Sequence, residues 1–277
     1  MFSSVVMESP LSSGNLNGLN TEAVALEEIK RWLGEEKQNL HARLEDKYLL
    51  TFLRGCHFDL EKTKTKMINY YTMKKDEVVW YRNRDPSLDE IQELVKLGVF
   101  VPLKELYQNR LVVIIRTGAH DPKKHTQDNV FRAGQMLTDI TTFLEYDCST
   151  IDGIIAIFDM KGVTAWHAKP LTPSVVKRSV FGWTNYLLPP DQFEFVNAPF
   201  YLNVMINLFK SFMSEEMKRK VRVHKGLDSF HKVFDKTILP VEYGGSGESL
   251  NSLILYWNEK LLGNRDWLLE DEKYRAE

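Results

Sequence analysis

The residues with the clearest potential for acid–base chemistry lie at the end of one apolar run. Asp159 ends the apolar part of "GIIAIFDMKG", and Lys161 and His167 follow within eight residues. A carboxylate beside an imidazole could transfer protons, because general acid–base catalysis needs titratable groups within hydrogen-bond reach. The alternative is that Asp159 is a polar strand terminus bonded to the backbone nearby. We favour this alternative.

The remaining histidines and glycines form no catalytic or metal-binding pattern. The seven His residues do not fall at metal-ligand spacing with Cys or Asp. His120 and His125 flank a Pro-Lys-Lys segment, which predicts surface loop residues. The Gly-rich segment 244–249 follows Pro240 without dinucleotide-binding spacing, so we interpret it as a turn. GxSxG, GxxxxGK[ST], HExxH and CxxC motifs are also missing. We therefore expect no enzyme, with no catalytic residue, metal or cofactor.

Composition and charge narrow the class of protein further. The 277 residues suggest one large domain or two modest ones. The net charge of −2 gives no overall attraction for nucleic acid, and we expect none as a partner. Cys56 and Cys148 cannot build a disulfide framework, which favours a reducing, cytoplasmic compartment. No stretch reaches the about 18 apolar residues that cross a bilayer, and residues 1–20 lack the pattern of a signal peptide.

Helical periodicity dominates residues 21–98, which we interpret as an all-helical module. We expect helices over 21–33, 45–55, 58–85 and 88–98. Thr21 and Asp59 are the expected N-caps of the first and third of these helices, and the third should be the longest. Residues 1–20 are rich in Ser, Asn and Gly, which predicts a disordered tail.

The pattern changes after residue 98, which indicates an α/β domain over 99–250 followed by a helical tail over 251–277. Short β-branched or aromatic runs predict strands at 110–118, 153–162 and 193–198, with a candidate fourth at 221–226. Helices are expected over 128–147 and 232–239. Strands that alternate with helices predict a parallel or mixed sheet with crossover helices.

A strongly apolar helix is expected over residues 200–213. Its polar residues form one narrow stripe, made by Asn203, Asn207, Lys210 and Ser211. An ordinary surface helix buries one apolar stripe and solvates the rest of its surface. Two explanations therefore remain open. The helix is buried centrally in the core, or it meets protein on one side and a ligand or a membrane on the other.

A basic cluster follows this helix closely. It consists of Lys218, Arg219, Lys220 and Arg222. Each cation near an anionic leaflet contributes about 1 kcal/mol of attraction, so the cluster predicts contact with anionic lipid. The alternative is an ordinary solvated face.

Six sequence blocks occur in the order and approximate spacing of a known family. They are "YLLTFLRGCHFDLEKTKTKMINYYTMK", "RLVVIIRTGAHDP", "DGIIAIFDMKGVTAWH", "TPSV", "FVNAP" and "ILPVEYGG". Over about residues 21–260 the chain resembles the CRAL-TRIO lipid-transfer family, in particular the branch that carries tocopherol and retinaldehyde. Any one block would be a weak signal, whereas six in order are specific.

The resemblance implies a helical N-terminal module and a lipid-binding domain with a mostly parallel sheet floor. It also implies that 200–213 is a mobile gate over an apolar pocket. The ligand-binding residues that it implies are Phe131, Gly134, Thr138, Ile154, Phe158, Trp166, Phe181, Trp183, Phe193, Phe195, Val204, Met205, Leu208 and Phe212. The implied partners are a hydrophobic small molecule and a transient membrane surface, and the implied state is a monomer.

The chain departs from the family pattern where phosphoinositide-binding members carry cations. The segment "LLPPDQFEF" contains Asp191 and Glu194 and no basic residue, and Cys56 occupies another position that is often basic. These departures count against phosphoinositide-triggered release and favour weaker contact with anionic lipid.

Together these observations predict a cytoplasmic carrier. It would bind one tocopherol-, retinoid- or carotenoid-like molecule and exchange it at membranes without reaction. The alternative is a phospholipid or phosphoinositide transfer protein or lipid sensor, and the third hypothesis is an enzyme that uses Asp159 or His167. Candidate polar anchors for the ligand are Thr138, Tyr186 and Asn197, each of which we expect to be structural.

Overall fold

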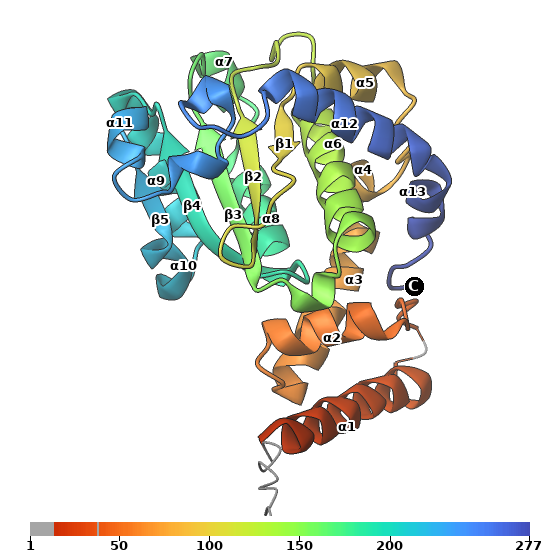
Figure 1. Cartoon of the computed structure of the whole chain (residues 1–277). Coiled ribbons are helices and arrows are strands. Elements are labelled where there is room, and N and C mark those ends of the chain that lie inside the picture. The colour runs from red at the N-terminus through yellow and green to blue at the C-terminus, as the bar shows by residue number, and fades with distance from the viewer. Residues whose placement is uncertain (1–13, 38) are drawn as a thin grey trace, which may run out of the picture.

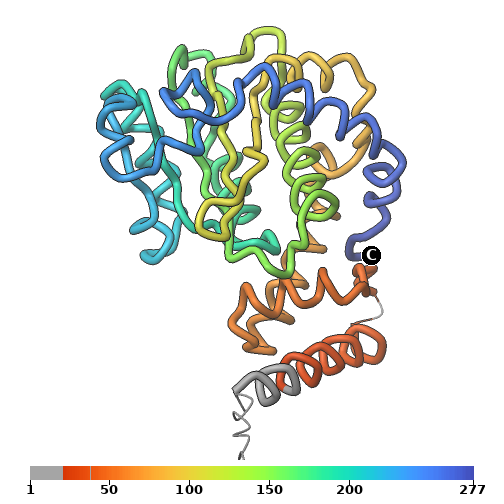
Figure 2. Tube along the Cα trace, viewed as in Figure 1, coloured from red at the N-terminus to blue at the C-terminus, as the bar shows by residue number. Residues whose placement is uncertain are grey.

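The first two helices of the chain lie at one end of the molecule, and the first of them is farthest from the sheet (Figures 1 and 2). The computed structural model describes residues 14–37 and 39–277, with the backbone alone for 14–20. Helix α1 spans Gly14–Glu35, so Thr21 lies inside the helix and the prediction that it is the N-cap is wrong. Of the tail predicted to be disordered, residues 14–20 are helical and 1–13 lie outside the described residues.

The other helices of this region agree closely with the predicted pattern, with one interruption. They are α2 (Asp46–Gly55), α3 (Leu60–Asp76), α4 (Val78–Tyr81) and α5 (Asp89–Lys96). Asp59 caps α3 as predicted, by accepting a hydrogen bond from the Lys62 amide. The helix expected to continue to residue 85 stops at Glu77, which leaves the helical conformation and forms a 2.5 Å ion pair with Arg178. The longest helix is therefore α1 rather than α3.

Five strands form one mixed sheet in the order β1-β2-β3-β4-β5. They are β1 (Phe100–Pro102), β2 (Arg110–Arg116), β3 (Gly153–Asp159), β4 (Pro190–Val196) and β5 (Val221–Val223). Strands β2 to β5 are parallel and β1 pairs antiparallel with β2. The predicted sheet type is thus confirmed. The sequence did not predict β1, because three residues are too short for a periodic signal.

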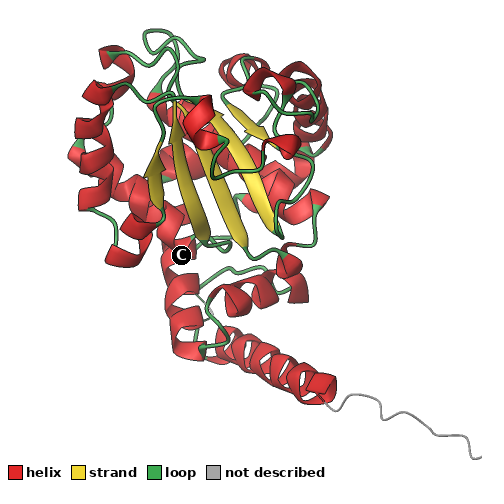
Figure 3. Cartoon of the chain, turned by 60° about the vertical axis from the view of Figure 1, so that its left-hand side comes forward, coloured by secondary structure: helices red, strands yellow, loops and turns green. Residues whose placement is uncertain are grey.

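Helices cover both faces of the sheet (Figure 3). Strand β2 is followed by α6 (Gln127–Ile140), which continues as a π-helical turn over Thr141–Glu145. Strand β3 is followed by α7 (Ala165–Ala168) and α8 (Pro173–Asn185). After β4 come a 3₁₀ turn at Phe200–Leu202, α9 (Asn203–Ser211), α10 (Glu215–Arg219) and α11 (Leu227–Phe230). The helix expected over 232–239 is not formed. Asp235 instead bonds the Thr237 amide and starts a 3₁₀ turn, a local bond that competes with helix.

The C-terminal region is helical as predicted, but it is part of the core rather than a tail. It consists of α12 (Leu250–Gly263) and α13 (Arg265–Asp271). Trp257 is buried and its indole Nε1 donates a 2.6 Å hydrogen bond to the Pro102 carbonyl. The chain then returns to the N-terminal helices, where the Ala276 amide bonds the Tyr71 carbonyl (Figure 2).

The two faces of the sheet have different environments because side chains alternate along each strand. On one face Ile155 and Ile157 are fully buried against the C-terminal segments. On the other face Ile154, Ala156 and Phe158 are only partly buried, since they border a cavity. Among the described residues, no helix is long and apolar enough to span a bilayer.

Candidate ligand cavity

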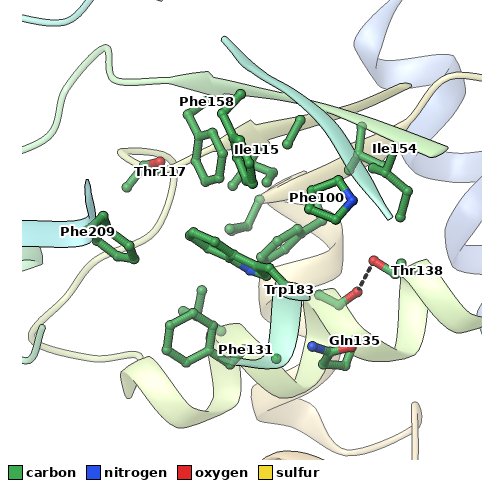
Figure 4. Close-up of a pocket in the computed structure, with 18 of the residues that line it drawn as sticks. Phe100, Ile115, Thr117, Phe131, Gln135, Thr138, Ile154, Phe158, Trp183 and Phe209 are labelled. Atoms are coloured by element: carbon green, nitrogen blue, oxygen red, sulfur yellow. Dashed lines mark hydrogen bonds between the residues drawn. The ribbon is translucent and has the colours of Figure 1, made fainter. Parts of the chain in front are cut away.

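An apolar cavity of about 190 Å³ lies between the sheet and helices α6, α8 and α9 (Figure 4). Its floor is set by strand register, which places side chains of three strands in rows. Val113, Ala156 and Phe193 form one row across β2, β3 and β4. The next row, one pleat further along, is Ile115, Phe158 and Phe195.

Most of the residues predicted to bind ligand line this cavity. They are Phe131, Gly134, Thr138, Ile154, Phe158, Trp183, Phe193, Phe195 and Met205. Gly134 has a steric reason to be glycine, because a Cβ there would lie 2.5 Å from the Phe100 ring. That these residues contact a ligand stays a prediction, but the cavity brings them together from α6, α8, α9 and two strands.

The other predicted residues do not line the cavity. They are Trp166, Phe181, Val204, Leu208 and Phe212. Phe181 precedes Trp183 by two residues on α8, and a two-residue step turns a side chain to the opposite side of a helix. Val204 precedes Met205 by one residue and is 78% exposed. Leu208 is half-buried against neighbouring apolar residues, one position before the lining residue Phe209.

The sequence reasoning missed several lining residues. They include Val113, Ile115, Thr117, His120, Gln127, Gln135, His167 and Phe209 as well as Phe100 of the unpredicted strand β1. Phe209 could have been found from its spacing of four from Met205, which places both on one helical face. No local pattern marks Thr117 or His120, because their position depends on the fold of the connection after β2.

Aromatic rings join helix α9 to the cavity floor. The ring of Phe209 on α9 stacks on Trp183 of α8, with centroids 5.4 Å apart and an interplanar angle of 12°. Trp183 lies 6.0 Å from Phe158, which stacks on Phe195 at 4.8 Å. Figure 4 shows Trp183 within the space that the rings enclose.

Helix α9 has two apolar sides. Ile206 is buried against the protein and Met205 and Phe209 face the cavity. On the outer side Val204 is exposed, as is Phe200 at the start of the preceding turn, with 85% exposure. The explanation that this helix is buried centrally in the core is therefore wrong. The arrangement agrees with a helix that meets protein on one side and another partner on the other.

The acid–base pair considered for Asp159 is not formed. Its carboxylate accepts hydrogen bonds from the Lys161 amide, the Asn197 amide group and the Tyr243 hydroxyl, at 2.8–3.0 Å. His167 instead bonds Thr164 and the backbone of His120. Asp159 is thus the polar strand terminus that we favoured.

The three candidate polar anchors all have structural partners. Asn197 bonds Asp159, and the Tyr186 hydroxyl donates a 2.7 Å hydrogen bond to Asp139. The Thr138 hydroxyl lines the cavity but donates to the Gly134 carbonyl at 2.9 Å (Figure 4). No group of three or more potential metal ligands is found in the described part of the chain.

The histidines of the connection after β2 are not surface residues, so that prediction is wrong. His120 and His125 are both more than nine-tenths buried, because this connection folds against α7. The ring centroid of His120 lies 6.2 Å from that of His125 and 4.9 Å from that of His167.

A buried network of charged side chains connects α6 to α13 and to the N-terminal helices. Asp271 of α13 pairs with Arg43, Lys74 and Arg84 at 2.9, 2.7 and 2.5 Å. Arg84 also pairs with Asp139 of α6 at 2.5 Å. Burial alone would raise the pKa of Asp271, but Lys74, Arg84 and Arg43 together hold it well below the usual range.

The basic cluster after α9 is largely paired with acids. Lys218 bonds Glu215, Lys220 bonds Glu216, and Arg222 bonds the buried Glu194. Arg219 is exposed and has no ion pair within the described residues. The cluster therefore offers fewer free cations than the sequence suggested.

Family models match the chain in two adjoining segments. The model described as "CRAL/TRIO domain" matches residues 96–245, and the model described as "Pinta-like, UBA domain" matches residues 20–91. Among curated proteins, the human alpha-tocopherol transfer protein-like protein is 25% identical over 242 residues, which cover 86% of this chain and 69% of the relative. Rat clavesin-2 is 25% identical over 211 residues, which cover 73% of this chain and 62% of that protein.

Among solved structures, the crystal structure of Sfh5 superposes with a TM-score of 0.58 at 16% identity. The match covers 88% of this chain and 92% of that one, and it supports the fold alone. Taken with the segment matched by the domain model and the cavity under α9, these likenesses lead to one conclusion. The chain belongs to the CRAL/TRIO family of lipid-binding and transfer proteins.

Proposed function

We propose that the protein carries one hydrophobic molecule, of tocopherol-, retinoid- or carotenoid-like character, and exchanges it at membranes without reaction. The observation that carries this proposal is the double apolar character of α9. Met205 and Phe209 close the cavity while Phe200 and Val204 face outward. A helix of this kind can contact a membrane when it leaves the cavity open.

The energy of burial is sufficient for such a carrier. An isoprenoid-sized ligand that hides about 400 Å² of apolar surface gains about 10 kcal/mol at about 25 cal/mol/Å². Association and ordering take back several kcal/mol, which leaves micromolar to nanomolar affinity.

The size of the cavity adds a requirement to the proposal. A void of about 150 Å³ holds a molecule such as benzene, and the cavity here is about 190 Å³. A longer ligand therefore needs the rings of Trp183 and Phe209 to move. Since Phe209 lies on α9, ligand entry and gate movement would be the same event.

The alternative, transfer of a phospholipid or phosphoinositide, requires an anion-binding group at the cavity mouth. Most cations of the 218–222 cluster are paired with acids, and no Lys or Arg lines the cavity within the described chain. These contacts favour an uncharged ligand.

The experiment that tests the proposal is native mass spectrometry of the protein purified from its natural source, followed by organic extraction of the bound compound. A single co-purified isoprenoid or polyene would support the carrier function and identify the ligand. A co-purified phospholipid would replace it with the alternative. A protein that neither co-purifies with nor takes up any apolar compound would contradict both.

A further inference from the structure

One end of the cavity contains polar atoms that the protein leaves unbonded. Thr117 follows β2, and Figure 4 shows it at the end of the cavity away from Thr138 and Ile154. The buried hydroxyl oxygen of Thr117 and the buried Nδ1 of His120 have no hydrogen-bond partner in the described residues. Both residues line the cavity. Buried polar groups are rarely left without a partner, so two at one end of an apolar cavity require an explanation.

The neighbouring histidines show that the unpaired nitrogen is specific to His120. His167 uses both nitrogens, since Nδ1 accepts from the Thr164 amide at 3.1 Å and Nε2 donates to the His120 carbonyl at 3.1 Å. His125 has acceptors at both nitrogens, the Asp121 carbonyl and the Glu93 carboxylate. These contacts fix the backbone around His120 and leave its Nδ1 available.

His120 is an uncharged group at neutral pH. Burial, with added repulsion from His167 and His125, lowers the pKa of His120 from 6.5 to about 4. The Asp121 charge and a contact with the Thr117 backbone act in the opposite direction. That contact does not have the geometry of a hydrogen bond to Nδ1. This end of the cavity is therefore polar and neutral.

We propose that Thr117 and His120 form the polar anchor of the cavity, and that they bind one uncharged oxygen, a hydroxyl or a carbonyl, at the end of an extended apolar ligand. This inference rests on the proposed carrier function and narrows its ligand class. A ligand hydroxyl can donate to Nδ1 of His120 and accept from the Thr117 hydroxyl. A ligand carbonyl can accept from both groups if Nδ1 carries the proton.

The same site disfavours two other ligand classes. A pure hydrocarbon that fills the cavity leaves both polar atoms unpaired, which is unfavourable. A carboxylate or phosphate brings a charge that no Lys or Arg among the described lining residues compensates. Lys123 and Lys169 flank Trp166 outside this cavity, each about 5.0 Å from its ring.

The test compares four probes with one carbon chain: farnesol, farnesal, farnesoate and farnesene. Dissociation constants are measured at pH 7.5 from the quenching of tryptophan fluorescence, since Trp183 lies in the cavity. The proteins are the wild type, Thr117→Val, His120→Leu and the matched control Thr184→Val. Thr184 lies on α8 beside the lining residue Trp183 but does not line the cavity, and its hydroxyl bonds the Val180 carbonyl.

We expect farnesol and farnesal to bind the wild type at least about tenfold more tightly than farnesene and farnesoate. Thr117→Val and His120→Leu should each weaken farnesol about tenfold. Farnesene affinity should not fall in either variant and should rise slightly, because one polar atom fewer is left unpaired, and this also shows that the variants are folded. Thr184→Val should bind all four probes as the wild type does, because Thr184 lies outside the cavity.

Several results would overturn the assignment. Equal affinity of the wild type for farnesol and farnesene would contradict the anchor assignment without contradicting the carrier function. Tightest binding of farnesoate would show that the anchor is cationic. An equal loss of farnesol binding in Thr184→Val would show that the losses in the other two variants are not specific to the anchor. Failure of all four probes to bind would contradict the carrier function itself, and the anchor with it.

Discussion

The wall of the cavity formed by α6 and the wall formed by α9 are held by different forces. Helix α6 is attached through Asp139 to Arg84, and Arg84 in turn to Asp271. Within the described chain, α9 forms no ion pair and no side-chain hydrogen bond to another element, and its contacts are apolar. Buried ion pairs are directional, whereas apolar contacts tolerate displacement. The contrast supports the proposal that the wall formed by α9 is the movable one and that the wall formed by α6 is fixed.

The largest expected effect is on stability, when the ion pairs that hold the α6 wall are removed. Asp271→Ala leaves Arg43, Lys74 and Arg84 buried around a missing carboxylate, which should lower the free energy of unfolding by about 3–5 kcal/mol. Urea denaturation measures the change. The matched control is Asp266→Ala on the same helix, whose side chain is fully exposed and whose loss should cost less than about 0.5 kcal/mol. Equal effects of the two variants would contradict the structural role of the network.

The next largest effect is on how long a bound ligand is retained, when an apolar contact of α9 is disrupted. Leu208→Asp places a carboxylate in the apolar contact under α9 and should speed dissociation of bound farnesol about thirtyfold, or about 2 kcal/mol. The free energy of unfolding should change by less than about 1 kcal/mol, because Leu208 is only half-buried and α9 lies at the edge of the core. Stopped-flow fluorescence gives the rate.

Asn207→Asp is the control for Leu208→Asp, since it adds the same charge at an exposed neighbouring position. A Leu208→Asp protein that unfolds, or one that retains farnesol normally, would show that α9 is not the gate.

A smaller effect concerns the outer side of α9. The double variant Phe200→Ser, Val204→Ser removes two exposed apolar side chains and should reduce binding to neutral phosphatidylcholine vesicles about tenfold. Vesicle flotation measures the bound fraction. Leu255→Ser on α12 is the control, because Leu255 is 62% exposed but lies on another helix. A loss of binding in the control instead would place the membrane surface at α12.

The smallest expected effect is on binding to anionic membranes, and it should differ between a cation without an ion pair and a paired one. Arg219→Ser should weaken binding to vesicles that contain phosphatidylserine by about 1 kcal/mol, or about fivefold, and high salt should remove the difference. Lys218→Ser should have a smaller effect, because Lys218 is paired with Glu215. Similar losses in the two variants would mean that the Glu215 pair opens at the membrane.

The features that the sequence predicted well are those encoded by neighbouring residues. Asp59 follows a local capping rule, and β2 and β3 are continuous apolar runs. It was harder to predict which side chain of α9 faces the cavity, since Leu208 and Phe209 differ by one position and only packing against Trp183 decides between them. His120 could not be placed at all, because its burial depends on His167, 47 residues later.

The network at Asp271 also has a consequence for how the protein is made. A ribosome delivers Arg84 long before its partner Asp271, which follows 187 residues later. During synthesis the N-terminal helices therefore carry cations whose counter-ion does not yet exist, and they cannot bury them at low cost. Stable docking of these helices must wait for α13. We expect folding of these helices to be completed only after α13 has left the ribosome.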